Sequence, residues 1–366
     1  MKLTRVDRLL KWLASKRAPS IQTTIDRTRQ APLKRPTDRI WPVAPYYFKQ
    51  ASRYFKQSGW QPAREDHGSS MESLNAPTSL RLLTWNVNFF QPNAEERLSC
   101  ALAHISRHLS IPPDSTTEIP VGTPTPFPCC ILLQEISVKM FSALLSYKWI
   151  REHFFIIPGH PEDWPSSKYG TVTLVSHSVP LLDAQSLEFG NSITGRTALL
   201  VDVLVGRSDT RAEYGGSAHE TSAPAVLRIG NLHLESMSQG SSKRPAQLEA
   251  AGRLLRNPSV VAGILAGDMN SISPSDADIH RLAGLEDAYE GGEDDVLGHT
   301  WGYQSERRSK RSRLDKIFYT ANTPIWIEDP QRVGVGLKTK RGQWVSDHYG
   351  LITTVRLKDI IKANSL

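Results

Sequence analysis

The sequence predicts a layered α/β fold in which at least one face of a sheet is covered by helices. Three observations support this prediction. Short apolar runs rich in β-prone residues recur from Leu80 onward, each bounded by polar turn residues. Two segments between these runs place apolar residues at helical spacing. The chain also contains 24 Gly and 24 Pro, which indicates many loops rather than a helical bundle.

Length and composition describe an ordinary globular protein with one large domain or two smaller ones. The chain has 366 residues, of which 39% are hydrophobic and 22% are charged. No apolar run reaches the length of a membrane span. Cys100, Cys129 and Cys130 show neither a disulfide framework nor zinc spacing, so we expect buried, reduced thiols in an intracellular protein.

Residues 1–78 are predicted to form a basic, Pro-rich N-terminal arm that is partly disordered or packed on the body. Residues 1–60 hold 14 Lys and Arg against three Asp, a net charge of +11 in a chain whose total is +7, which leaves −4 for the remainder. Such an arm favours contact with a polyanion or an acidic surface, and a solvated tail is the alternative. The aromatic cluster between Trp41 and Trp60 is expected to pack on the body, and residues 61–78 to form a linker.

The start of the arm bears on cellular location. Residues 1–17 have the spacing of an amphipathic helix but lack the apolar core and cleavage site of a secretory signal. They resemble a mitochondrial presequence, although Asp7 counts against that interpretation. We therefore expect an intracellular protein of the nucleus or cytoplasm, with the mitochondrion as the alternative.

The body, residues 79–366, contains the predicted strands and helices. The strands are expected, in chain order, at Leu80–Val87, Cys130–Leu133, Thr171–Ser176, Thr197–Val205, Val226–Leu234, Val260–Ala266, Leu314–Tyr319 and Leu351–Leu357. Helices are predicted over Glu95–Leu109 and Ala246–Leu255, the second after a Ser-Ser-Lys-Arg-Pro sequence that suits a helix start. Residues 110–127, 206–225 and 290–312 are polar loops.

Polar residues of similar chemistry stand at the ends of these strands. Four runs end in or lead into a set of amide, carboxylate and imidazole side chains: Asn86, Glu135, His233, Asp268 and Asn270. Another run opens with Asp315, and Asp347-His348 stands at the head of the last run. Each motif alone is also typical of an ordinary turn or strand end, but the completeness of the set favours a shared site.

Oxygen ligands in this set suit a divalent metal ion. Glu135 and the other carboxylates are hard ligands, and Asn86 can add an amide oxygen. Ligation by oxygen alone favours Mg²⁺ or Mn²⁺ over zinc. The metal would then act as a Lewis acid on a leaving oxygen.

The remaining side chains suit hydrolysis of a phosphodiester. Asp268 can orient or deprotonate a water nucleophile, and Asn270 can donate a hydrogen bond to that water or to the phosphate. His348 and His233 can donate to non-bridging phosphate oxygens as negative charge develops.

The successive motifs resemble those of the endonuclease/exonuclease/phosphatase superfamily and occur in its order over roughly residues 80–357. They are Thr84-Trp85-Asn86, Leu133-Gln134-Glu135, Asn231-Leu232-His233-Leu234-Glu235-Ser236, Gly267-Asp268-Met269-Asn270, Leu314-Asp315-Lys316-Ile317-Phe318 and Ser346-Asp347-His348. The resemblance implies a DNase I-like, four-layered α/β-sandwich, with two mixed sheets packed face to face and helices outside. It also implies a Mg²⁺-dependent phosphoesterase.

The same resemblance implies a role for each matching position. Asn86 and Glu135 match the metal-side residues, and Asp268 and Asn270 match those that position the attacking water. The phosphate side and its support are implied for three further residues: His348, the second histidine His233, and Asp347, which would support both His348 and the metal.

Within this superfamily the motif sequences resemble most those of the 5′-tyrosyl-DNA phosphodiesterase branch, as in His233-Leu234-Glu235-Ser236 and His299-Thr300-Trp301. The substrate-binding residues that this implies are Ser236, Trp301, Tyr169, Arg196, Arg313 and Asp315. The basic run Arg307, Arg308, Lys310, Arg311 and Arg313 is either a contact for the phosphate backbone or a solvated loop. The chain departs from the branch at Lys316, where an Arg is expected, and in the arm.

We therefore expect a monomeric, Mg²⁺-dependent phosphodiesterase that binds nucleic acid and hydrolyses phosphoester bonds at its ends, with 5′-phosphotyrosyl-DNA as one substrate. An alternative within the same chemistry is an enzyme for another phosphoester, such as abasic DNA, poly(A), an inositol phosphate or a sphingolipid. A binding module that kept the fold and lost the chemistry is the alternative of a different class.

Overall fold

The computed structural model describes residues 37–50, 58–63, 76–111, 127–166, 168–206, 225–305 and 310–357. The chain divides into the compact units Met1–Arg35 and Pro36–Leu366, and both sheets belong to the second. The predicted helix over residues 1–17 lies outside the described residues.

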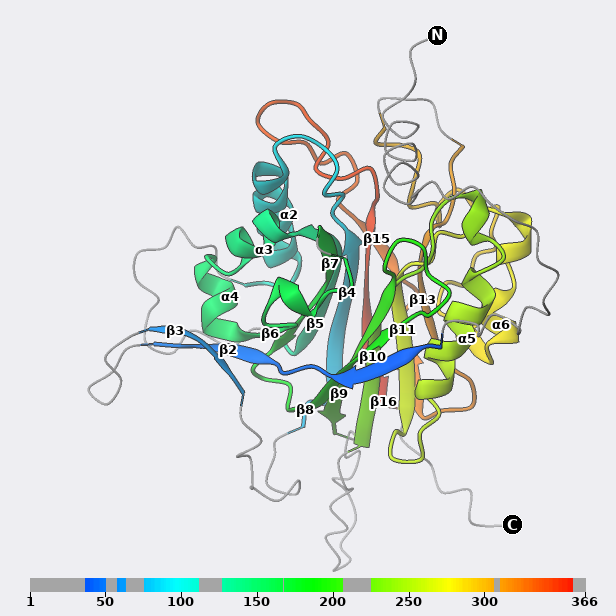
Figure 1. The fold of residues 1–366 in the computed structure, drawn as a ribbon, viewed down its shortest axis with the longest axis horizontal. Coiled ribbons are helices and arrows are strands. Elements are labelled where there is room, and N and C mark those ends of the chain that lie inside the picture. The colour runs from blue at the N-terminus through cyan, green and yellow to red at the C-terminus, as the bar shows by residue number, and fades with distance from the viewer. Residues whose placement is uncertain are drawn as a thin grey trace, which may run out of the picture. The chain divides into compact units, whose positions relative to one another are not determined.

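The first sheet contains seven strands among the described residues (Figure 1). Their order across the sheet is β1 (Arg39–Pro42), β8 (Leu181–Glu188), β9 (Thr197–Val205), β10 (Ala225–His233), β11 (Ala262–Asp268), β13 (Asp315–Thr320) and β12 (Leu285–Asp287). Only β10 and β11 run parallel among these strands, and the other neighbours are antiparallel.

The second sheet contains nine strands within the same described ranges. Eight follow the order β14 (Ile325–Ile327), β16 (Gly350–Leu357), β4 (Ser79–Asn86), β5 (Cys129–Ser137), β7 (Tyr169–Ser176), β6 (Phe154–Ile157), β2 (Tyr46–Lys49) and β3 (Gly59–Pro62). The ninth, β15 (Gln331–Val333), pairs with β16. Again one pair of the described strands is parallel, β4 with β5.

Helices cover the outer face of each sheet, which gives four layers (Figure 1). Helices α2 (Ala94–His108), α3 (Val138–Leu144) and α4 (Lys148–His153) pack on the second sheet, while α5 (Arg244–Leu254) and α6 (Ile279–Leu282) pack on the first. Short 3-10 turns occur at Pro161–Asp163, Ser238–Gly240 and Pro274–Asp276. The predicted α/β-sandwich of two packed mixed sheets is confirmed. None of the helices in the described part of the chain is long and apolar enough to cross a bilayer.

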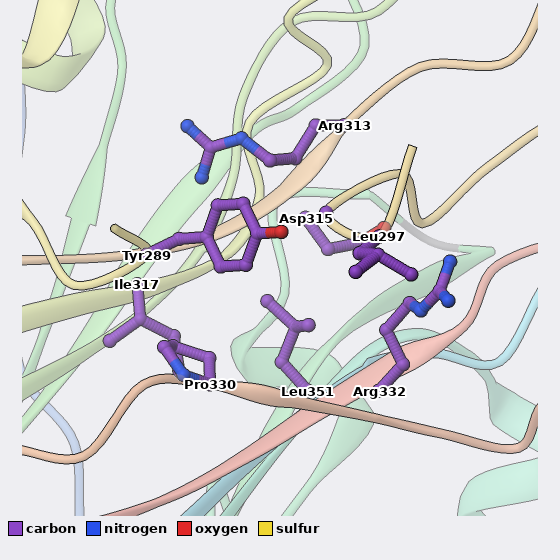
Figure 2. Close-up of a pocket in the computed structure, with 9 residues that line it drawn as sticks. Tyr289, Leu297, Arg313, Asp315, Ile317, Pro330, Arg332 and Leu351 are labelled. Atoms are coloured by element: carbon purple, nitrogen blue, oxygen red, sulfur yellow. The ribbon is translucent and has the colours of Figure 1, made fainter. Parts of the chain in front are cut away.

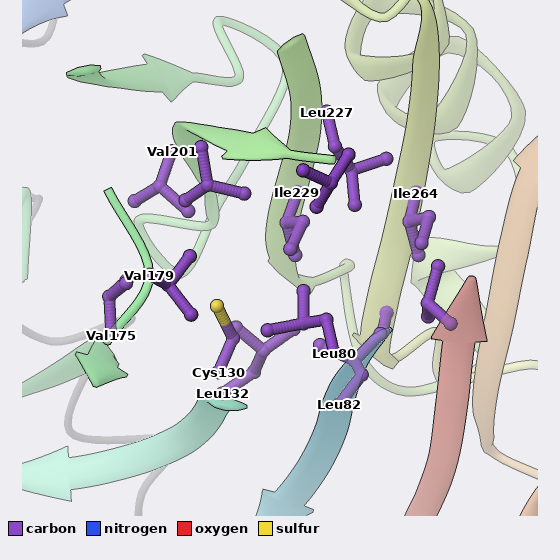
Figure 3. Close-up of a cluster of buried hydrophobic side chains, with 14 of the residues drawn as sticks. Leu80, Leu82, Cys130, Leu132, Val175, Val179, Val201, Leu227, Ile229 and Ile264 are labelled. Carbon is purple, nitrogen blue, oxygen red and sulfur yellow. The ribbon is translucent and has the colours of Figure 1, made fainter. Parts of the chain in front are cut away.

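The main core lies between the two sheets, and Figure 3 shows part of it. Leu80, Leu82 and Leu132 of the second sheet meet Ile229 and Ile264 of the first. Alternate residues of the same strands face the helices instead, for example Leu83 and Trp85 of β4. Because side chains alternate between the two faces of a strand, burial on both faces explains the nearly continuous apolar runs in the sequence.

The two neighbouring cysteines follow this alternation. Cys130 packs between the sheets and Cys129 packs under the helices, and both are free thiols. Burial raises the pKa of Cys129 to about 12, so this thiol stays protonated and unreactive at neutral pH. The prediction of buried, unpaired cysteines therefore holds for this pair, while Cys100 on α2 is half-buried.

Each of the eight predicted strands and both predicted helices has a counterpart within a few residues of its expected bounds. The eight-residue strand β8, the short strands β6, β12, β14 and β15, and the helices α3, α4 and α6 were not predicted. Strands β1, β2 and β3 come from the segment assigned to the arm: β1 pairs with β8, and β2 pairs with β6. The aromatic segment between Trp41 and Trp60 thus contributes strands to the sheets of the body, as far as it is described.

Candidate active site

The site lies where the two parallel strand pairs end. Asn86 is opposite Gln134 in β4 and β5, so Glu135 follows directly, and His233 is opposite Asp268 in β10 and β11. Carboxyl ends of parallel neighbours share one edge of a sheet. Since the two sheets pack face to face, the strand ends from both sheets meet at one edge of the sandwich.

A glycine allows the two strands of the first sheet to approach at this point. Gly267 has φ +149°, and a Cβ added there would lie 1.9 Å from the carbonyl oxygen of Leu232 on β10. Other residue types would clash with this carbonyl and would also be strained at that φ. Gly267 therefore sets the position of Asp268 beside His233.

Asp268 is the centre of the buried cluster. Its Oδ2 accepts a hydrogen bond from Nδ2 of Asn86 at 3.0 Å, and its Oδ1 accepts one from the backbone N–H of Asn270 at 2.9 Å. The same Oδ2 lies 3.4 Å from Nε2 of His233 and 3.9 Å from Nε2 of His348. Burial raises the pKa of Asp268 to about 6, against the opposing effect of His348. A carboxylate held in this way can accept a proton near neutral pH.

His348 is held in its cationic form by Asp315. Nδ1 of His348 donates to Oδ2 of Asp315 across 2.8 Å. Burial alone would lower the pKa of His348, but the charges of Asp315 and Asp268 and this hydrogen bond outweigh burial and raise the pKa well above its usual value. The resemblance assigned the support of His348 to Asp347, but in the structure the hydrogen bond to His348 Nδ1 comes from Asp315, and Asp347 contributes through its charge alone.

His233 is held as the neutral tautomer that carries its proton on Nε2. Nη1 of Arg196 lies 2.7 Å from Nδ1 of His233, and since a guanidinium only donates, Nδ1 must accept. Burial and the charge of Arg196 lower the pKa of His233 well below its usual value. The Nε2–H group therefore points into the site as an uncharged donor, in contrast to the cationic His348.

Glu135 reaches the site through an irregularity in β5. Its φ is +60°, and the register of β5 against β7 shifts between Leu133 and Ile136. A bulge redirects a side chain at this kind of position, and such strain is typical of functional sites. Oε1 of Glu135 lies 4.0 Å from Nε2 of His233, and burial raises the pKa of Glu135 to about 7.

Asp347 is anchored by two neutral donors. Nδ2 of Asn88 donates to its Oδ1 at 2.7 Å, and Nε1 of Trp301 donates to its Oδ2 at 3.1 Å. Its charge further raises the pKa of Glu135. Within the described residues, no hydrogen bond satisfies the carboxylate of Glu135.

The predicted metal-side residues fit a hard divalent ion. Glu135 and Asp347 bring two half-buried carboxylates into one region, where like charges repel, and a cation between them would relieve this repulsion. The amide of Asn86 turns its nitrogen to Asp268, while its oxygen accepts the backbone N–H of Asn88 at 3.0 Å. Asp268, Asp315 and His348 are also close enough together to hold an ion, but the hydrogen bond between Asp315 and His348 already accounts for their proximity.

Two of the predicted substrate-side residues, Tyr169 and Arg196, lie together beside His233. The guanidinium of Arg196 lies 5.7 Å from the centre of the Tyr169 ring, and the Phe89 ring stacks on the Tyr169 ring with their centres 4.2 Å apart. Ser236 is half-buried in the loop after β10. Trp301 is half-buried and joined to Asp347, as described above.

The other predicted substrate-side residues, Arg313 and Asp315, line a small pocket (Figure 2). Arg313 is buried, and its guanidinium forms ion pairs with Asp287 and Glu293. Asp315 borders the same pocket while it holds His348. Arg307 and Arg308 of the basic run lie outside the described residues.

A family model described as the Endonuclease/Exonuclease/phosphatase family matches residues 83–348. The chain belongs to the endonuclease/exonuclease/phosphatase family. Among proteins of known function, it is similar to tyrosyl-DNA phosphodiesterase 2 of Mus musculus, with 26% identity over 243 residues. That match covers 63% of this chain and 58% of the mouse protein, so the chain spans less than two thirds of this relative's length.

Solved structures show that this family member shares its fold with tyrosyl-DNA phosphodiesterases. One match is D. rerio TDP2 complexed with a single-strand DNA product, with a TM-score of 0.55, 21% identity and coverage of 76% of this chain and 99% of that one. Another is truncated Caenorhabditis elegans TDP2, with a TM-score of 0.53, 18% identity and coverage of 76% and 97%.

Three residues that were not predicted as site residues also support the site. They are Asn88, Glu235 and Thr300. Asn88 lies two residues after Asn86, and that spacing on one side of an extended segment was its only signal. Glu235 accepts hydrogen bonds from Ser192 Oγ, the backbone N–H of Ile193 and Thr194 Oγ1. These bonds fix the loop that carries Arg196. The hydroxyl oxygen of Thr300 accepts the backbone N–H groups of Leu314 and Asp315.

Proposed function

We propose that this chain is a divalent-metal-dependent phosphodiesterase that hydrolyses phosphoester bonds at nucleic-acid ends, with 5′-phosphotyrosyl-DNA as a substrate. One observation carries the proposal. The Asp268 carboxylate lies between two histidine Nε2 atoms, 3.4 Å from His233 and 3.9 Å from His348. A phosphate bound beside these three side chains would have Asp268 as a base for a water molecule and the two histidines as hydrogen-bond donors for its oxygens.

Asp268 is the group that handles the water. It accepts one proton from the water as the water oxygen forms its bond to phosphorus, and the bond from phosphorus to the leaving oxygen breaks. The leaving oxygen departs with the electron pair and is protonated by solvent. Asn86 and the backbone N–H of Asn270 hold the Asp268 carboxylate in place for this transfer.

The two histidines act on the phosphate in different ways. His348 is cationic and supplies both a charge and a hydrogen bond to the developing oxyanion, while Asp315 keeps it charged and oriented. His233 supplies an uncharged Nε2–H donor, because Arg196 holds its other nitrogen as an acceptor. Together they would stabilise the charge that builds up on the non-bridging oxygens.

Glu135 and Asp347, with the oxygen of Asn86, are the residues that would hold Mg²⁺ or Mn²⁺. The ion would supply Lewis-acid stabilisation of negative charge on the phosphoester oxygens. Ligands of this type match a hard cation rather than zinc.

The substrate class rests on the relatives and on an aromatic stack in this chain. The mouse relative is a tyrosyl-DNA phosphodiesterase, and a D. rerio relative has been solved with a single-strand DNA product. In this chain Phe90, Phe89 and Tyr169 form a continuous set of rings that leads from an exposed position to Arg196. An aryl leaving group or an unpaired base would pack on such rings.

The test uses two variants of the purified 366-residue chain with Mg²⁺. Asp268→Asn and Glu135→Gln are expected to lower kcat on a 5′-tyrosyl oligonucleotide by at least about 10²-fold, because the proton acceptor or a metal ligand is lost. Asp202→Asn is the matched control, since this carboxylate pairs with Arg228 and takes no part in the site. Full activity in either site variant would contradict the proposal.

A screen of substrates separates the alternatives. Abasic DNA, poly(A), phosphoinositides and sphingomyelin are compared with the tyrosyl oligonucleotide under the same conditions, and turnover of a lipid alone would reject the nucleic-acid assignment. A calorimetric titration with Mg²⁺, with and without substrate, tests the binding-module alternative. Failure to bind the metal in both cases would favour that alternative.

A further inference from the structure

A basic hairpin stands beside the site and has no role in the chemistry described so far. It comprises residues 337–345, and its strands are joined by hydrogen bonds from Val345 N–H to Leu337 O and from Thr339 N–H to Gln343 O. Gly342, with φ +76°, forms the turn. In Figure 1 it belongs to the orange-red loop above α2, and Arg341 pairs there with Glu96 of that helix at 3.1 Å.

The hairpin concentrates positive charge on its exposed side. It carries Lys338, Lys340 and Arg341, and the sequence contains no Asp or Glu between Asp329 and Asp347. Lys338 and Lys340 are exposed, and neither forms an ion pair with any residue in the described part of the chain. Since the chain outside residues 1–60 has a net charge of −4, this local excess of positive charge is not a general property of the body.

The hairpin also presents an aromatic surface. The ammonium of Lys338 lies 4.1 Å from the centre of the half-buried Trp344 ring. A second cation–aromatic pair occurs at Tyr303, where the guanidinium of the exposed Arg311 lies 4.6 Å from the centre of the ring, and this ring stacks on Tyr349 at 5.5 Å. Cations that alternate with aromatic faces bind single-stranded nucleic acid through backbone charge and base stacking.

Gln304, the residue after Tyr303, links both cation–aromatic pairs to the site through hydrogen bonds. Gln304 is buried, donates from Nε2 to the carbonyl of Ser346 at 2.9 Å and accepts the backbone N–H of Gly336 at 2.7 Å. Trp344 precedes Asp347 by three residues, which is about 10 Å at the rise of an extended chain. A nucleic-acid strand whose end lies at Asp268 would therefore meet this surface within its first few nucleotides.

We propose that residues 337–345, together with Tyr303 and Arg311, form a binding track for the nucleic-acid strand that extends from the scissile phosphate. This inference rests on the proposed function and adds the surface that selects a polynucleotide over a small phosphoester. The four carboxylates of the site, Glu135, Asp268, Asp315 and Asp347, repel a polyanion, so a cationic surface next to them is needed to hold the strand.

The experiment compares the double variant Lys338→Ala/Lys340→Ala with the wild-type chain on two substrates. On a 5′-tyrosyl single-stranded oligonucleotide, KM is expected to rise about tenfold near physiological salt, with kcat retained. The slope of log KM against log salt is expected to flatten by about 1.4, because two phosphate contacts are lost from a single strand. On bis(p-nitrophenyl) phosphate, which has no strand to bind, both constants should stay unchanged.

Two further variants make the result specific. Lys338→Arg/Lys340→Arg keeps the charge and is expected to restore KM, whereas Arg253→Ala/Arg281→Ala removes two exposed charges from α5 and α6 and should change nothing. An unchanged KM and salt slope in Lys338→Ala/Lys340→Ala would overturn the proposal. An equal loss on both substrates would also overturn it, since the hairpin would then be a support of the site.

Binding of a fluorescent oligonucleotide, measured by anisotropy without turnover, separates this proposal from the proposed function. If no phosphoester is hydrolysed and the lysine variant still loses oligonucleotide binding, the track stands and the enzymatic assignment fails. Binding of phosphatidylserine vesicles is measured in the same variant. If Lys338→Ala/Lys340→Ala binds the vesicles more weakly than the wild type does but binds the oligonucleotide equally well, the hairpin contacts a lipid surface and the proposed track is rejected.

Discussion

Arg196 donates to Nδ1 of His233 at 2.7 Å and thereby determines which nitrogen of this histidine carries the proton. The guanidinium has no acceptor function, so the neutral imidazole must place its proton on Nε2, which faces Asp268. The pair joins a loop residue to a strand residue. It is held from behind by Glu235 through the loop that precedes Arg196.

Replacement of Arg196 should therefore impair catalysis more than folding. Arg196→Met is expected to lower kcat about 10²-fold, the usual cost of losing one donor to a developing oxyanion, because His233 is no longer fixed as an Nε2–H donor. Arg196→Lys keeps a donor and should recover part of the loss. Nitrogen-15 NMR of the His233 ring would show the change of tautomer. A kcat in Arg196→Met within twofold of the wild type would contradict this role.

Loss of the Asp315 charge should lower the catalytic rate as much as loss of His348, which Asp315 keeps charged and oriented. Asp315→Asn removes the charge that keeps His348 cationic, and we expect kcat to fall by about 10³–10⁴-fold, as for other buried carboxylates that orient a catalytic histidine. The free energy of unfolding should change much less than the rate. Asp202→Asn serves as the control, because this partner of Arg228 lies outside the site. Similar kinetic losses in both variants would indicate a general structural effect.

Glu135 should destabilise the metal-free protein. Its half-buried carboxylate is repelled by the charges of Asp347 and Asp268, and the repulsion is relieved when the charge of Glu135 is removed. In EDTA, Glu135→Gln is expected to raise the free energy of unfolding by about 1 kcal/mol, as other changes that relieve strain in functional sites do. Mg²⁺ at a hundredfold excess over its Kd should add about 2.7 kcal/mol to the wild type and little to the variant. Urea unfolding would measure both, and equal stabilisation by Mg²⁺ would remove Glu135 from the metal site.

His104 on α2 should make the fold sensitive to acid. Burial, with His108 and Arg107, lowers its pKa to about 4, and its Nε2 accepts the backbone N–H of Gly334 at 3.1 Å. The unfolded chain binds more protons between pH 6.5 and 4, so the contribution of His104 is complete above pH 6.5 and is lost as pH falls toward 4.

The variant His104→Gln keeps an acceptor for Gly334 but does not titrate. After allowance for solvent screening of this half-buried group, it should reduce the loss of stability between pH 7.5 and pH 5 by about 1 kcal/mol. Urea unfolding at the two pH values provides the measurement. An identical pH dependence in the wild type and the variant would show that His104 titrates normally in the folded chain.

The sequence is informative about the strands and less so about contacts between them. Runs such as Thr197–Val205 are recognisable because burial on both faces requires apolar residues at nearly every position. Strand β8 was missed because its sequence, Leu-Leu-Asp-Ala-Gln-Ser-Leu-Glu, mixes polar and apolar residues in an edge region that β1 completes. Short strands such as β12 gain their structure from pairing with β13 rather than from their own three residues.

The residues of the site were recognisable, but their partners were not. Asp347 and His348 are neighbours in the sequence, which suggested that one supports the other. In the structure Asp347 meets Asn88 and Trp301, and His348 meets Asp315, which is 33 positions away. Successive residues of an extended segment face opposite ways, so a partner at that sequence distance emerges only from the packing of β13 beside the final loop.

The segment that carries β1 and β2 adds strands to the ends of both sheets. β1 pairs with β8 at the end of one sheet, and after three intervening residues β2 begins and pairs with β6 in the other sheet. Without these strands, β8 and β6 would present unpaired backbone donors and acceptors, which are templates for association with other chains. Fragments that begin at residue 79 are thus expected to associate through the exposed edges of β8 and β6, so β1 and β2 protect the body from aggregation.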